Sequence, residues 1–374
     1  MVQQSNAARD MTQEYSTDSH LSHVAMTTKE IDKTQSTGGN GMTSYSVILE
    51  NQFYMQCALI FVGIVGIAGN SVILYALVAS KQHKKHALIV NQNALDLFCS
   101  FFLVVTYAAQ MFSIHLTGAF GYWMCIVILS ENIVWWGANG SMVNLAIITI
   151  DRYLKVVHPI WSRKHLHRWV INVEIAFSWF AGISYNSLML YNSTGLKDGR
   201  CEDYYQLASY LADLLAFIWY VLFFYIMILV TFIFCYGRIL VAIRRQARVM
   251  ASHSGSSTAQ AQSNQIQTNV IKTMILVSAL YAIFWLPCNT YCLLATMQLV
   301  PNFTFFNNGD YTVIFFVGFL YNSVNPFIYA TKFNPVRKIL IKMIPCKKTA
   351  VKPTDGTETA SAPATVTRTG QDRY

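Results

Sequence analysis

Seven long apolar stretches constrain the fold of this chain more than any other feature of its sequence. They cover residues 56–79, 87–112, 122–150, 169–191, 207–236, 270–296 and 309–330. Each is long enough for a helix to cross a hydrocarbon layer about 30 Å thick. Only 12% of the residues are charged, about half the usual fraction, which fits lipid better than the core of a soluble protein. We therefore predict an all-α membrane protein, a seven-transmembrane helix bundle.

The distribution of lysine and arginine predicts how the bundle is oriented, because cytoplasmic loops carry an excess of these residues. Segments 81–86, 155–168, 238–272 and 332–348 contain three, four, five and six of them, whereas segments 113–121 and 299–308 contain none. We predict a multi-pass protein of the plasma membrane with its N-terminus outside and its C-terminus inside. The net charge of +9 fits lipid headgroups beside the span ends, so no nucleic-acid partner is expected.

Polar segments flank and interrupt the spans. We expect residues 1–50 to form a disordered extracellular tail and residues 347–374 a disordered cytoplasmic tail. The transmembrane domain is predicted over residues 51–331, and its first span is expected to act as an uncleaved signal anchor. The stretch 250–268 is too polar to pack, which indicates a flexible inner loop between the fifth and sixth spans.

Few polar residues lie inside the spans, where such groups are costly unless they find partners in the bundle interior. Asp96 in the second span lies alone in an apolar run, and it needs hydroxyls, amides, water or a cation to remain ionised. A sodium ion held by Asp96 and its neighbours is one interpretation, and an interhelical hydrogen-bond knot without a regulatory role is the other. The predicted sodium site consists of Asn70, Asp96, Ser141 and Asn325.

Two prolines, Pro287 and Pro326, lie inside the sixth and seventh spans. Each removes a backbone hydrogen bond and is expected to kink or loosen its helix. Beside buried polar groups, such helices are expected to act as hinges.

Six short motifs occur in order along the spans: GN in the first, LD in the second, DRY at the end of the third, Trp179 in the fourth, FWLP in the sixth and NPFIY in the seventh. Together they resemble the rhodopsin-like (class A) G-protein-coupled receptors over residues 50–346. The resemblance implies a heterotrimeric G protein and an extracellular ligand, bound in an outer-facing helical cavity. It assigns G-protein coupling and activation to Asp151, Arg152, Tyr153, Tyr236, Asn325, Pro326 and Tyr329, and a toggle and hinge to Trp285 and Pro287.

The DRY motif is expected to change partners on activation. The resemblance implies that Asp151 holds Arg152 at rest and that Arg152 then swings toward the bundle core and contacts the G protein. An arginine at the inner edge of a membrane can also snorkel to water, so a positive-inside anchor is the alternative.

The sequence departs from the family pattern at several positions. Phe284 replaces the cysteine that usually precedes the tryptophan of the sixth span, and the fifth span lacks its usual proline. Gln267 replaces the acid that often pairs with the DRY arginine, so we expect a weakly held resting state.

Cys125 at the start of the third span and Cys201 in the following outer loop both lie on the oxidising side, which favours a disulfide between them. The resemblance agrees, although Cys125 lies two residues farther from DRY than usual. Residues 332–346 resemble the family's amphipathic eighth helix, with Phe333, Ile339 and Leu340 toward lipid.

Several sites of modification are expected in the outer loops and near the C-terminus. Cys346 is a candidate for palmitoylation. Asn192 and Asn302 are candidates for glycosylation, whereas the sequon at Asn139 lies inside a span and is read as a chance match. The Thr-rich tail is expected to bind arrestin and a receptor kinase.

The helical stripe through Arg152 runs back to Glu131 and is expected to face the cavity. An amine receptor would need an acid at Val134, and an opsin would need a lysine at Phe319 in the seventh span, so both subclasses are disfavoured. The aromatic outer half suits a peptide with aromatic and basic residues, or a small amphipathic molecule. The ligand-binding candidates are Glu131, Val134, Trp135, Ala138, Trp285, Asn289, Phe315 and Phe319, with Asp213 as a further polar point.

A neuropeptide receptor is the leading interpretation. A membrane transporter is a remote alternative, since no internal repeat is evident. An enzyme is not expected, because Asp96 and Glu174 are the only acids deep inside the spans and lie on different helices. No metal site and no cofactor other than sodium are expected.

Overall fold

The computed structural model describes residues 40–112, 115–203, 210–252, 258–299 and 309–343. Its helices, π-helical turns (η) and strands are, in chain order, α2 (Asn40–Ala79), α3 (Ala87–Met111), α4 (Gly118–Met124), η1 (Cys125–Leu129), α5 (Asn132–Val157), α6 (Pro159–His165), α7 (Arg168–Ser193), β1 (Thr194–Lys197), β2 (Arg200–Asp203), α8 (Tyr210–Tyr220), η2 (Val221–Ile226), α9 (Met227–Ser252), α10 (Thr258–Thr296), α11 (Gly309–Lys332) and α12 (Asn334–Met343).

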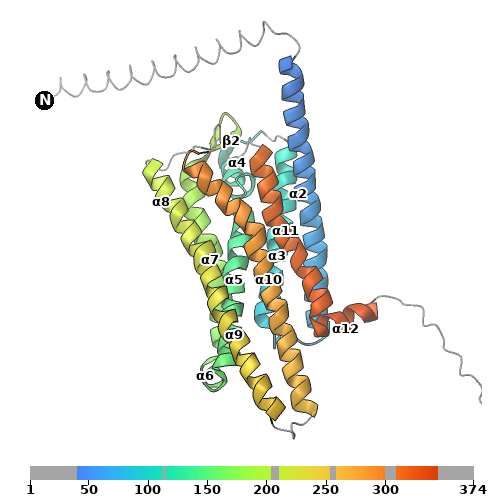
Figure 1. The fold of residues 1–374 in the computed structure, drawn as a ribbon. Coiled ribbons are helices and arrows are strands. Elements are labelled where there is room, and N and C mark those ends of the chain that lie inside the picture. The colour runs from blue at the N-terminus through green and yellow to red at the C-terminus, as the bar shows by residue number, and fades with distance from the viewer. Residues whose placement is uncertain (1–39, 113–114, 204–209, 253–257, 300–308, 344–374) are drawn as a thin grey trace, which may run out of the picture.

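Seven long helical rods lie side by side and form one bundle (Figure 1). The rods are α2, α3, α4–η1–α5, α7, α8–η2–α9, α10 and α11. Among the described residues, six of them are long and apolar enough to cross a membrane, and α7 completes the seven with 26 residues. The short α12 leaves the bundle at the end opposite to β1 and β2 (Figure 1). The predicted seven-helix all-α fold is confirmed, with one small hairpin added.

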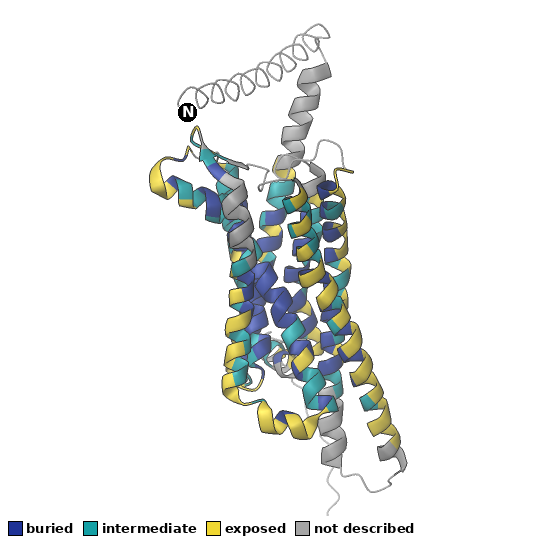
Figure 2. Ribbon diagram, turned by 90° about the vertical axis from the view of Figure 1, so that its left-hand side faces the viewer, coloured by how far each residue is buried: buried dark blue, intermediate teal, exposed yellow. Residues whose placement is uncertain are grey.

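Polar and apolar side chains are distributed as expected for a bundle in lipid. Phe61, Phe180 and Ile233 are 67%, 67% and 76% exposed on the outside. Asn70 and Asp96, by contrast, are fully buried. Figure 2 shows the buried residues concentrated along the middle of the bundle and the exposed ones on its outer faces. Lipid solvates apolar side chains, so the interior is where the polar groups find partners.

Two helices extend farther than their apolar stretches predict. α2 begins at Asn40, within the segment expected to be a tail. α10 begins at Thr258, so most of the stretch 250–268 is helical, and residues 253–257 lie outside the described residues. The sequence from Thr258 onward is rich in Ala and Gln, which are good helix formers. Adding turns to an existing helix avoids the cost of nucleation, so polarity alone is a poor guide to where these helices end.

Both proline-containing helices continue through their prolines, Pro287 in α10 and Pro326 in α11. At Pro326 the neighbouring helix comes very close. A Cβ atom on Gly69 of α2 would lie 2.9 Å from the Cβ and Cγ atoms of Pro326. Only glycine fits there, so the GN motif of the first span serves the packing of α2 against the NPFIY motif.

The third rod is interrupted near the end that carries β1 and β2, which we call the hairpin end. η1 is a π-helical turn, and Glu131, which follows it, has a left-handed backbone with φ 62°. A π-turn accommodates one extra residue, and a left-handed residue ends a right-handed helix. Both features lie between Cys125 and the DRY motif, the segment that is two residues longer than the resemblance predicts.

The fifth rod contains a similar interruption. η2 is a π-helical segment between α8 and α9, in the rod that lacks the proline usual in this family. A π-segment breaks the regular hydrogen bonding of an α-helix, as a proline does.

β1 and β2 form an antiparallel hairpin that the sequence analysis did not predict. Leu196 pairs with Cys201, and Lys197 pairs with Arg200. The turn residues Asp198 and Gly199 have φ values of 50° and 74°, as a two-residue hairpin turn requires. The Asp-Gly dipeptide was the available signal. The turn is anchored by the Leu116 N–H, which donates to the Gly199 carbonyl over 2.9 Å.

Candidate functional site

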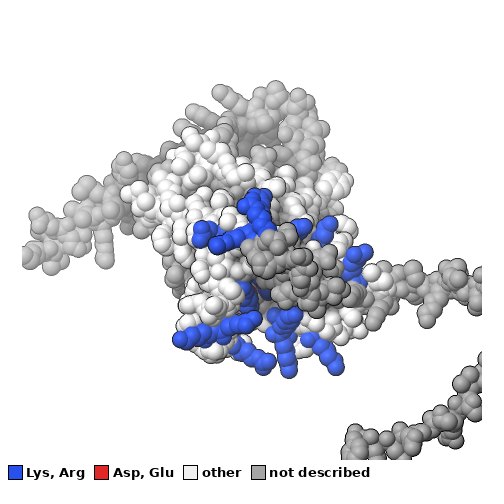
Figure 3. All heavy atoms as spheres, turned by 60° about the horizontal axis from the view of Figure 1, so that its bottom comes forward, with Lys and Arg blue, Asp and Glu red and all other residues white. Residues whose placement is uncertain are grey.

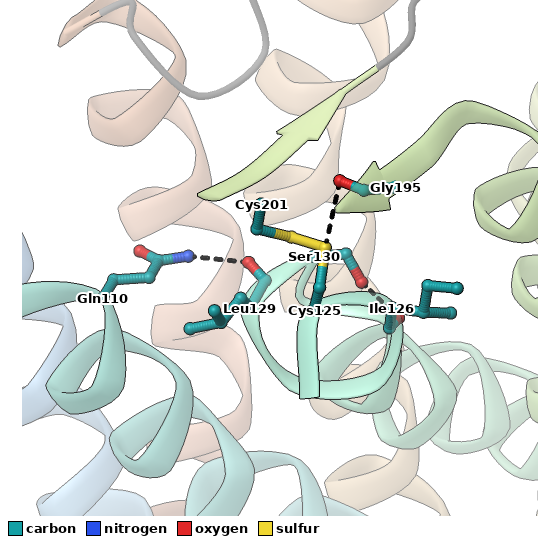
Figure 4. Close-up of a disulfide and its surroundings, with 7 residues drawn as sticks. All are labelled: Gln110, Cys125, Ile126, Leu129, Ser130, Gly195 and Cys201. Atoms are coloured by element: carbon teal, nitrogen blue, oxygen red, sulfur yellow. Dashed lines mark hydrogen bonds between the residues drawn. A yellow bond between two sulfur atoms is a disulfide. The ribbon is translucent and has the colours of Figure 1, made fainter. Parts of the chain in front are cut away.

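The disulfide between Cys125 and Cys201 ties the hairpin to the third rod, as predicted. It joins the first residue of η1 to β2, across 76 residues of sequence, with the Cα atoms 5.3 Å apart. Figure 4 shows the Cys125 sulfur facing the Gly195 carbonyl of β1, at 3.4 Å. Both strands are therefore held against η1.

The π-turn is stabilised by side chains from α3. Gln110 donates to the Leu129 carbonyl over 3.0 Å, and Thr106 donates to the Ile128 carbonyl over 3.1 Å. Ser130 donates back to the Ile126 carbonyl (Figure 4). Side chains thus satisfy carbonyls at a place where the regular helical pattern is broken.

Glu131 is the buried acid of the hairpin end, with only 2% of its surface exposed. Its carboxylate accepts a hydrogen bond from the Tyr107 hydroxyl over 2.7 Å. Its backbone carbonyl accepts from the N–H groups of Val134 and Trp135, at 2.9 and 3.1 Å, which starts α5. The left-handed backbone therefore places an acid next to the first turn of α5.

An aromatic cluster lies below Glu131 and joins three rods. The Trp135 ring of α5 lies 5.7 Å from that of Trp285, 5.1 Å from Phe315 and 5.7 Å from Phe319. Asn289 donates to the Trp285 carbonyl over 2.8 Å, one turn along α10. The remaining ligand-binding candidates, Val134 and Ala138, are buried on α5. The structure thus joins the four aromatic candidates directly, while the side chain of Asp213 lies outside the described residues.

Asp96 lies in the middle of the bundle and is surrounded by polar partners. Ser141 donates to its Oδ1 atom over 2.6 Å, and Asn325 donates to its Oδ2 atom over 3.0 Å. Gln92 lies 3.4 Å from Oδ1 and also donates to Ser141. Asn70 donates instead to backbone carbonyls, those of Gly66 and Asn322. Three of the four residues of the predicted sodium site are therefore joined, Asn70 is not, and Gln92 was missed.

A second polar group links α3, α5 and α7. Asn91 donates to Asn144 over 2.9 Å and to Ser178 over 3.0 Å. Trp179 donates to Asn91 over 2.9 Å, and Asn144 donates to Gln92 over 2.8 Å. The tryptophan motif of the fourth span is thus connected through Gln92 to Asp96. The run of amides in NQNALDL was the available signal for this network.

The DRY motif shows an arrangement that the sequence analysis did not expect. The Arg152 Nε atom lies 3.6 Å from the Asp151 carboxylate. Lys155, one turn farther along α5, lies closer, with its Nζ atom 2.7 Å from Oδ1 and 2.9 Å from Oδ2. Asp151 is therefore held mainly by Lys155, because positions i and i+4 lie on the same face of a helix. Tyr153 points away, and its hydroxyl lies 3.2 Å from His158 Nε2.

Two activation tyrosines lie near the same end of the bundle. The Tyr236 hydroxyl lies 3.0 Å from Thr149 of α5 and 3.0 Å from Ser278 of α10. Tyr329 of α11 is fully buried, and its hydroxyl has no hydrogen-bond partner among the described residues. Tyr236 thus links three rods, while Tyr329 is the group that still lacks a partner.

α12 confirms the predicted eighth helix but not the direction of Phe333. Phe333 is 1% exposed, and its ring packs edge-on against His86 at 5.1 Å, so it does not face lipid. An amphipathic pattern cannot distinguish a residue that faces lipid from one that docks the helix on the bundle. Ile339 and Leu340 are half-buried, and Ile341 is 57% exposed.

Burial and nearby cations lower the pKa of His86 from 6.5 to about 4. The cations are, in order of effect, Arg152, Lys85 and Lys155. His86, just before α3, is therefore neutral at pH 7. It lies between Phe333, which precedes α12, and the DRY motif.

The side chains of the predicted modification sites lie outside the described residues. Asn192 belongs to the last turn of α7 rather than to a loop, and its side chain lies outside the described residues, as do Asn302 and Cys346. Asn139 is fully buried and accepts a hydrogen bond from Tyr220, which fits a chance sequon.

Basic residues gather at the end of the bundle that carries α6 and α12, which we call the basic end. Figure 3 shows lysines and arginines over this face, and no acidic side chain among the described atoms in view. The exposed residues there include Lys84, Arg163, Lys164, Arg168, Arg244, Lys332 and Arg337.

Comparisons with known proteins agree with this architecture. Residues 69–329 match the family described as 7 transmembrane receptor (rhodopsin family). Melanopsin of Phodopus sungorus is 25% identical over 316 residues, 79% of this chain and 63% of the melanopsin. Melanin-concentrating hormone receptor 1 of Macaca mulatta is 26% identical over 320 residues, 81% of this chain and 82% of the receptor. Trace amine-associated receptor 9 of Rattus norvegicus is 27% identical over 214 residues, which are 54% of this chain and 61% of that receptor.

The chain thus spans about three-fifths of the length of the melanopsins that it matches. The family match covers most of the bundle, from Gly69 at the Pro326 contact to Tyr329 in α11. The chain belongs to the rhodopsin family of seven-transmembrane receptors and is therefore a receptor rather than an enzyme.

Proposed function

We propose that this receptor binds an extracellular ligand at the hairpin end and activates a heterotrimeric G protein at the basic end. One observation carries the proposal. The single helix α5 carries Trp135 of the aromatic cluster, Ser141 of the Asp96 network and Asp151 of the DRY motif. A rigid helix in contact with all three can pass a change at one end to the other.

The basic end is proposed to be cytoplasmic, with the N-terminus outside. The positive-inside rule supports this orientation, since the exposed lysines and arginines gather at that end (Figure 3). The position of the disulfide supports it too, because disulfides persist in oxidising compartments.

The ligand is proposed to be a peptide with aromatic and basic residues, as for a neuropeptide. Glu131 supplies a negative charge, and the four rings of the cluster supply π-faces that attract cations. Two relatives carry the names of a hormone and of trace amines, but this chain has Val134 where an amine receptor needs an acid. It also has Phe319 where an opsin needs its lysine, although melanopsins are among the relatives. A small amphipathic ligand is the alternative.

Further partners are proposed from the sequence. A sodium ion at Asp96 would favour the resting state. Arrestin and a receptor kinase would bind the Thr-rich tail, a palmitoyl group would attach to Cys346, and glycans would attach to Asn192 and Asn302.

Nucleotide exchange tests the proposal. The receptor in lipid nanodiscs is mixed with purified G proteins of several subtypes, and the rate of GTP loading is measured with members of a peptide library and with small amphipathic molecules. We expect at least one basic, aromatic peptide to accelerate exchange. Arg152→Ala should nearly abolish the acceleration while agonist binding persists, with a weaker affinity because the agonist and the G protein reinforce each other.

A matched comparison is Arg163→Ala, which removes an exposed arginine of α6 at the same end and should lower exchange much less than Arg152→Ala does. Acceleration by small molecules alone would favour the alternative ligand class. If Arg152→Ala exchanges as fast as the parent at equal expression, the DRY motif is only an anchor.

A further inference from the structure

The carboxylate of Asp151 is the most deeply buried charge of the basic end. Its side chain is 1% exposed, whereas those of Arg152 and Lys155 are 16% and 34% exposed. A buried carboxylate needs a cation and hydrogen bonds to offset its lost hydration. Two cations of the same helix are within reach, and they compete for one acid.

The distances favour Lys155. Its ammonium contacts both carboxylate oxygens, at 2.7 and 2.9 Å, whereas the Arg152 Nε atom lies 3.6 Å from one of them. The Nε atom is buried and has no hydrogen-bond partner among the residues that the structure describes. Arginine normally pairs with a carboxylate through two parallel hydrogen bonds, and Lys155 occupies the oxygens that such a pair would use.

A second acid lies on α7, which packs against α5, but it forms no salt bridge with this group in the structure. Glu174 of α7 is half-buried, and the charges of both Asp151 and Lys155 act on it. Its Oε2 atom is buried and has no hydrogen-bond partner within the described part of the chain. Glu174 thus offers Lys155 a second acceptor on the neighbouring rod, whereas the salt bridge of Arg152 within the described part of the chain is the one to Asp151.

We propose that Lys155 is a positioning residue that competes with Arg152 for the carboxylate of Asp151, with Glu174 as the second acceptor of the lysine. The inference rests on the coupling role proposed above for Arg152. While Lys155 satisfies Asp151, Arg152 is released toward a G protein at little cost. When Lys155 pairs with Glu174 instead, Asp151 pairs with Arg152 again and the receptor returns to its resting state.

The test is ligand-free nucleotide exchange per receptor, in membranes with equal surface expression. Lys155→Met leaves Asp151 to Arg152 alone and should lower exchange about threefold, the scale of one partly exposed ion pair. Lys155→Arg should restore most of the rate. Glu174→Gln leaves Lys155 to Asp151 and should raise the rate. Lys84→Met, which removes an exposed lysine of the loop before α3, measures the effect of losing one positive charge at the basic end, and its rate should lie closer to that of the parent than the rate of Lys155→Met does.

The competition also predicts that the effect of Lys155→Met on nucleotide exchange disappears when Asp151 is made neutral. In Asp151→Asn, the further change Lys155→Met should alter exchange little, because the shared acceptor is gone. An undiminished effect in that background, an unchanged rate in Lys155→Met, or a rate in Glu174→Gln at or below that of the parent would overturn the proposal.

Thermal unfolding tests the competition without any G protein, so a failure of coupling can be recognised separately. In a double-mutant cycle of Arg152→Gln and Asp151→Asn, the two residues should be weakly coupled in the melting temperature of the purified receptor. The coupling should increase when the cycle is repeated in Lys155→Met. Equal coupling in both backgrounds shows that no competition exists. A parent receptor that loads no G protein, with or without peptides, refutes the coupling role instead.

Discussion

At the scale of single residues, the centre of the bundle is organised around one carboxylate. Asp96 accepts hydrogen bonds from Ser141 and Asn325, which come from two other rods. Each donor also fixes the position of its helix, because a polar contact in an apolar interior is lost only at considerable cost. A cation bound there would be sensitive to any relative movement of α3, α5 and α11.

We predict that Asp96→Asn removes the effect of sodium on agonist affinity. In the parent, sodium should lower that affinity by about fivefold to tenfold, because an ion that binds the resting state better shifts the equilibrium toward it. The measurement is competition binding of an agonist in sodium chloride and in a chloride salt of a large organic cation. Ser141→Ala should weaken the effect, whereas Asn70→Ala should retain it, since Asn70 bonds to backbone carbonyls. Sodium sensitivity that survives in Asp96→Asn would exclude this site.

We also predict that His86 makes the receptor less stable in acid. An unfolded histidine takes up a proton near pH 6.5, whereas the folded one resists protonation down to about pH 4. Between these values the unfolded chain binds more protons, so stability falls as the pH falls, by about 2 kcal/mol from pH 7 to pH 5. The melting temperature of the purified receptor should decrease over this range.

His86→Gln should flatten that dependence, because glutamine does not titrate. The control is His165→Gln, in the exposed α6, which should leave it unchanged. A pH profile that is the same in parent and His86→Gln would show that other groups cause the acid sensitivity.

At the scale of elements, the hairpin and the π-turn form one clamped unit at the hairpin end of the bundle. The disulfide joins β2 to η1, and Leu116 bonds to the hairpin turn from the preceding loop. Side chains of α3 hold η1 from the other side. The disulfide thus holds the two parts of the unit together, and the hydrogen bonds from α3 attach the unit to the bundle.

We predict that Cys125→Ser or Cys201→Ser lowers agonist affinity and surface expression. Losing a cross-link over 76 residues should cost about 2–4 kcal/mol of stability. Flow cytometry of tagged receptor and saturation binding measure the two effects. Cys57→Ser, at a free and half-buried cysteine of α2, is the matched control. Mutants that express and bind like the parent would show that the noncovalent contacts suffice.

The sequence predicted elements better than their ends. The seven rods could be predicted because lipid demands long apolar stretches, and Asp96 could be matched with Ser141 and Asn325 because buried polar groups need partners. Gln92 was missed because it lies near the start of its span, where an amide could equally face the interface. Phe333 was placed wrongly because its partner, His86, is far away in the sequence. The closeness of Lys155 to Asp151 depends on side-chain geometry, which a motif does not specify.

At the scale of the whole molecule, the third rod connects all the sites. It contributes Cys125 to the clamp, Trp135 to the aromatic cluster, Ser141 to the Asp96 network and Asp151 to the ion pairs. Among its neighbours, α3 reaches the clamp and the Asp96 network, and α11 reaches the aromatic cluster and the Asp96 network. Movements of α10 or α11 are therefore sensed by α5 directly through Trp285 and Phe319, and indirectly through the bond of Asn325 to Asp96, which Ser141 shares.

The left-handed residue at Glu131 gives this rod a mechanical joint. A residue with φ 62° cannot belong to a right-handed helix, so we expect the clamped hairpin and η1 on one side, and α5 on the other, to move as two bodies joined at Glu131. A ligand that contacts only the hairpin would then move the hairpin and η1 about Glu131 without moving α5. For ligand binding to affect the basic end, the ligand has to extend past Glu131 and contact Trp135 itself.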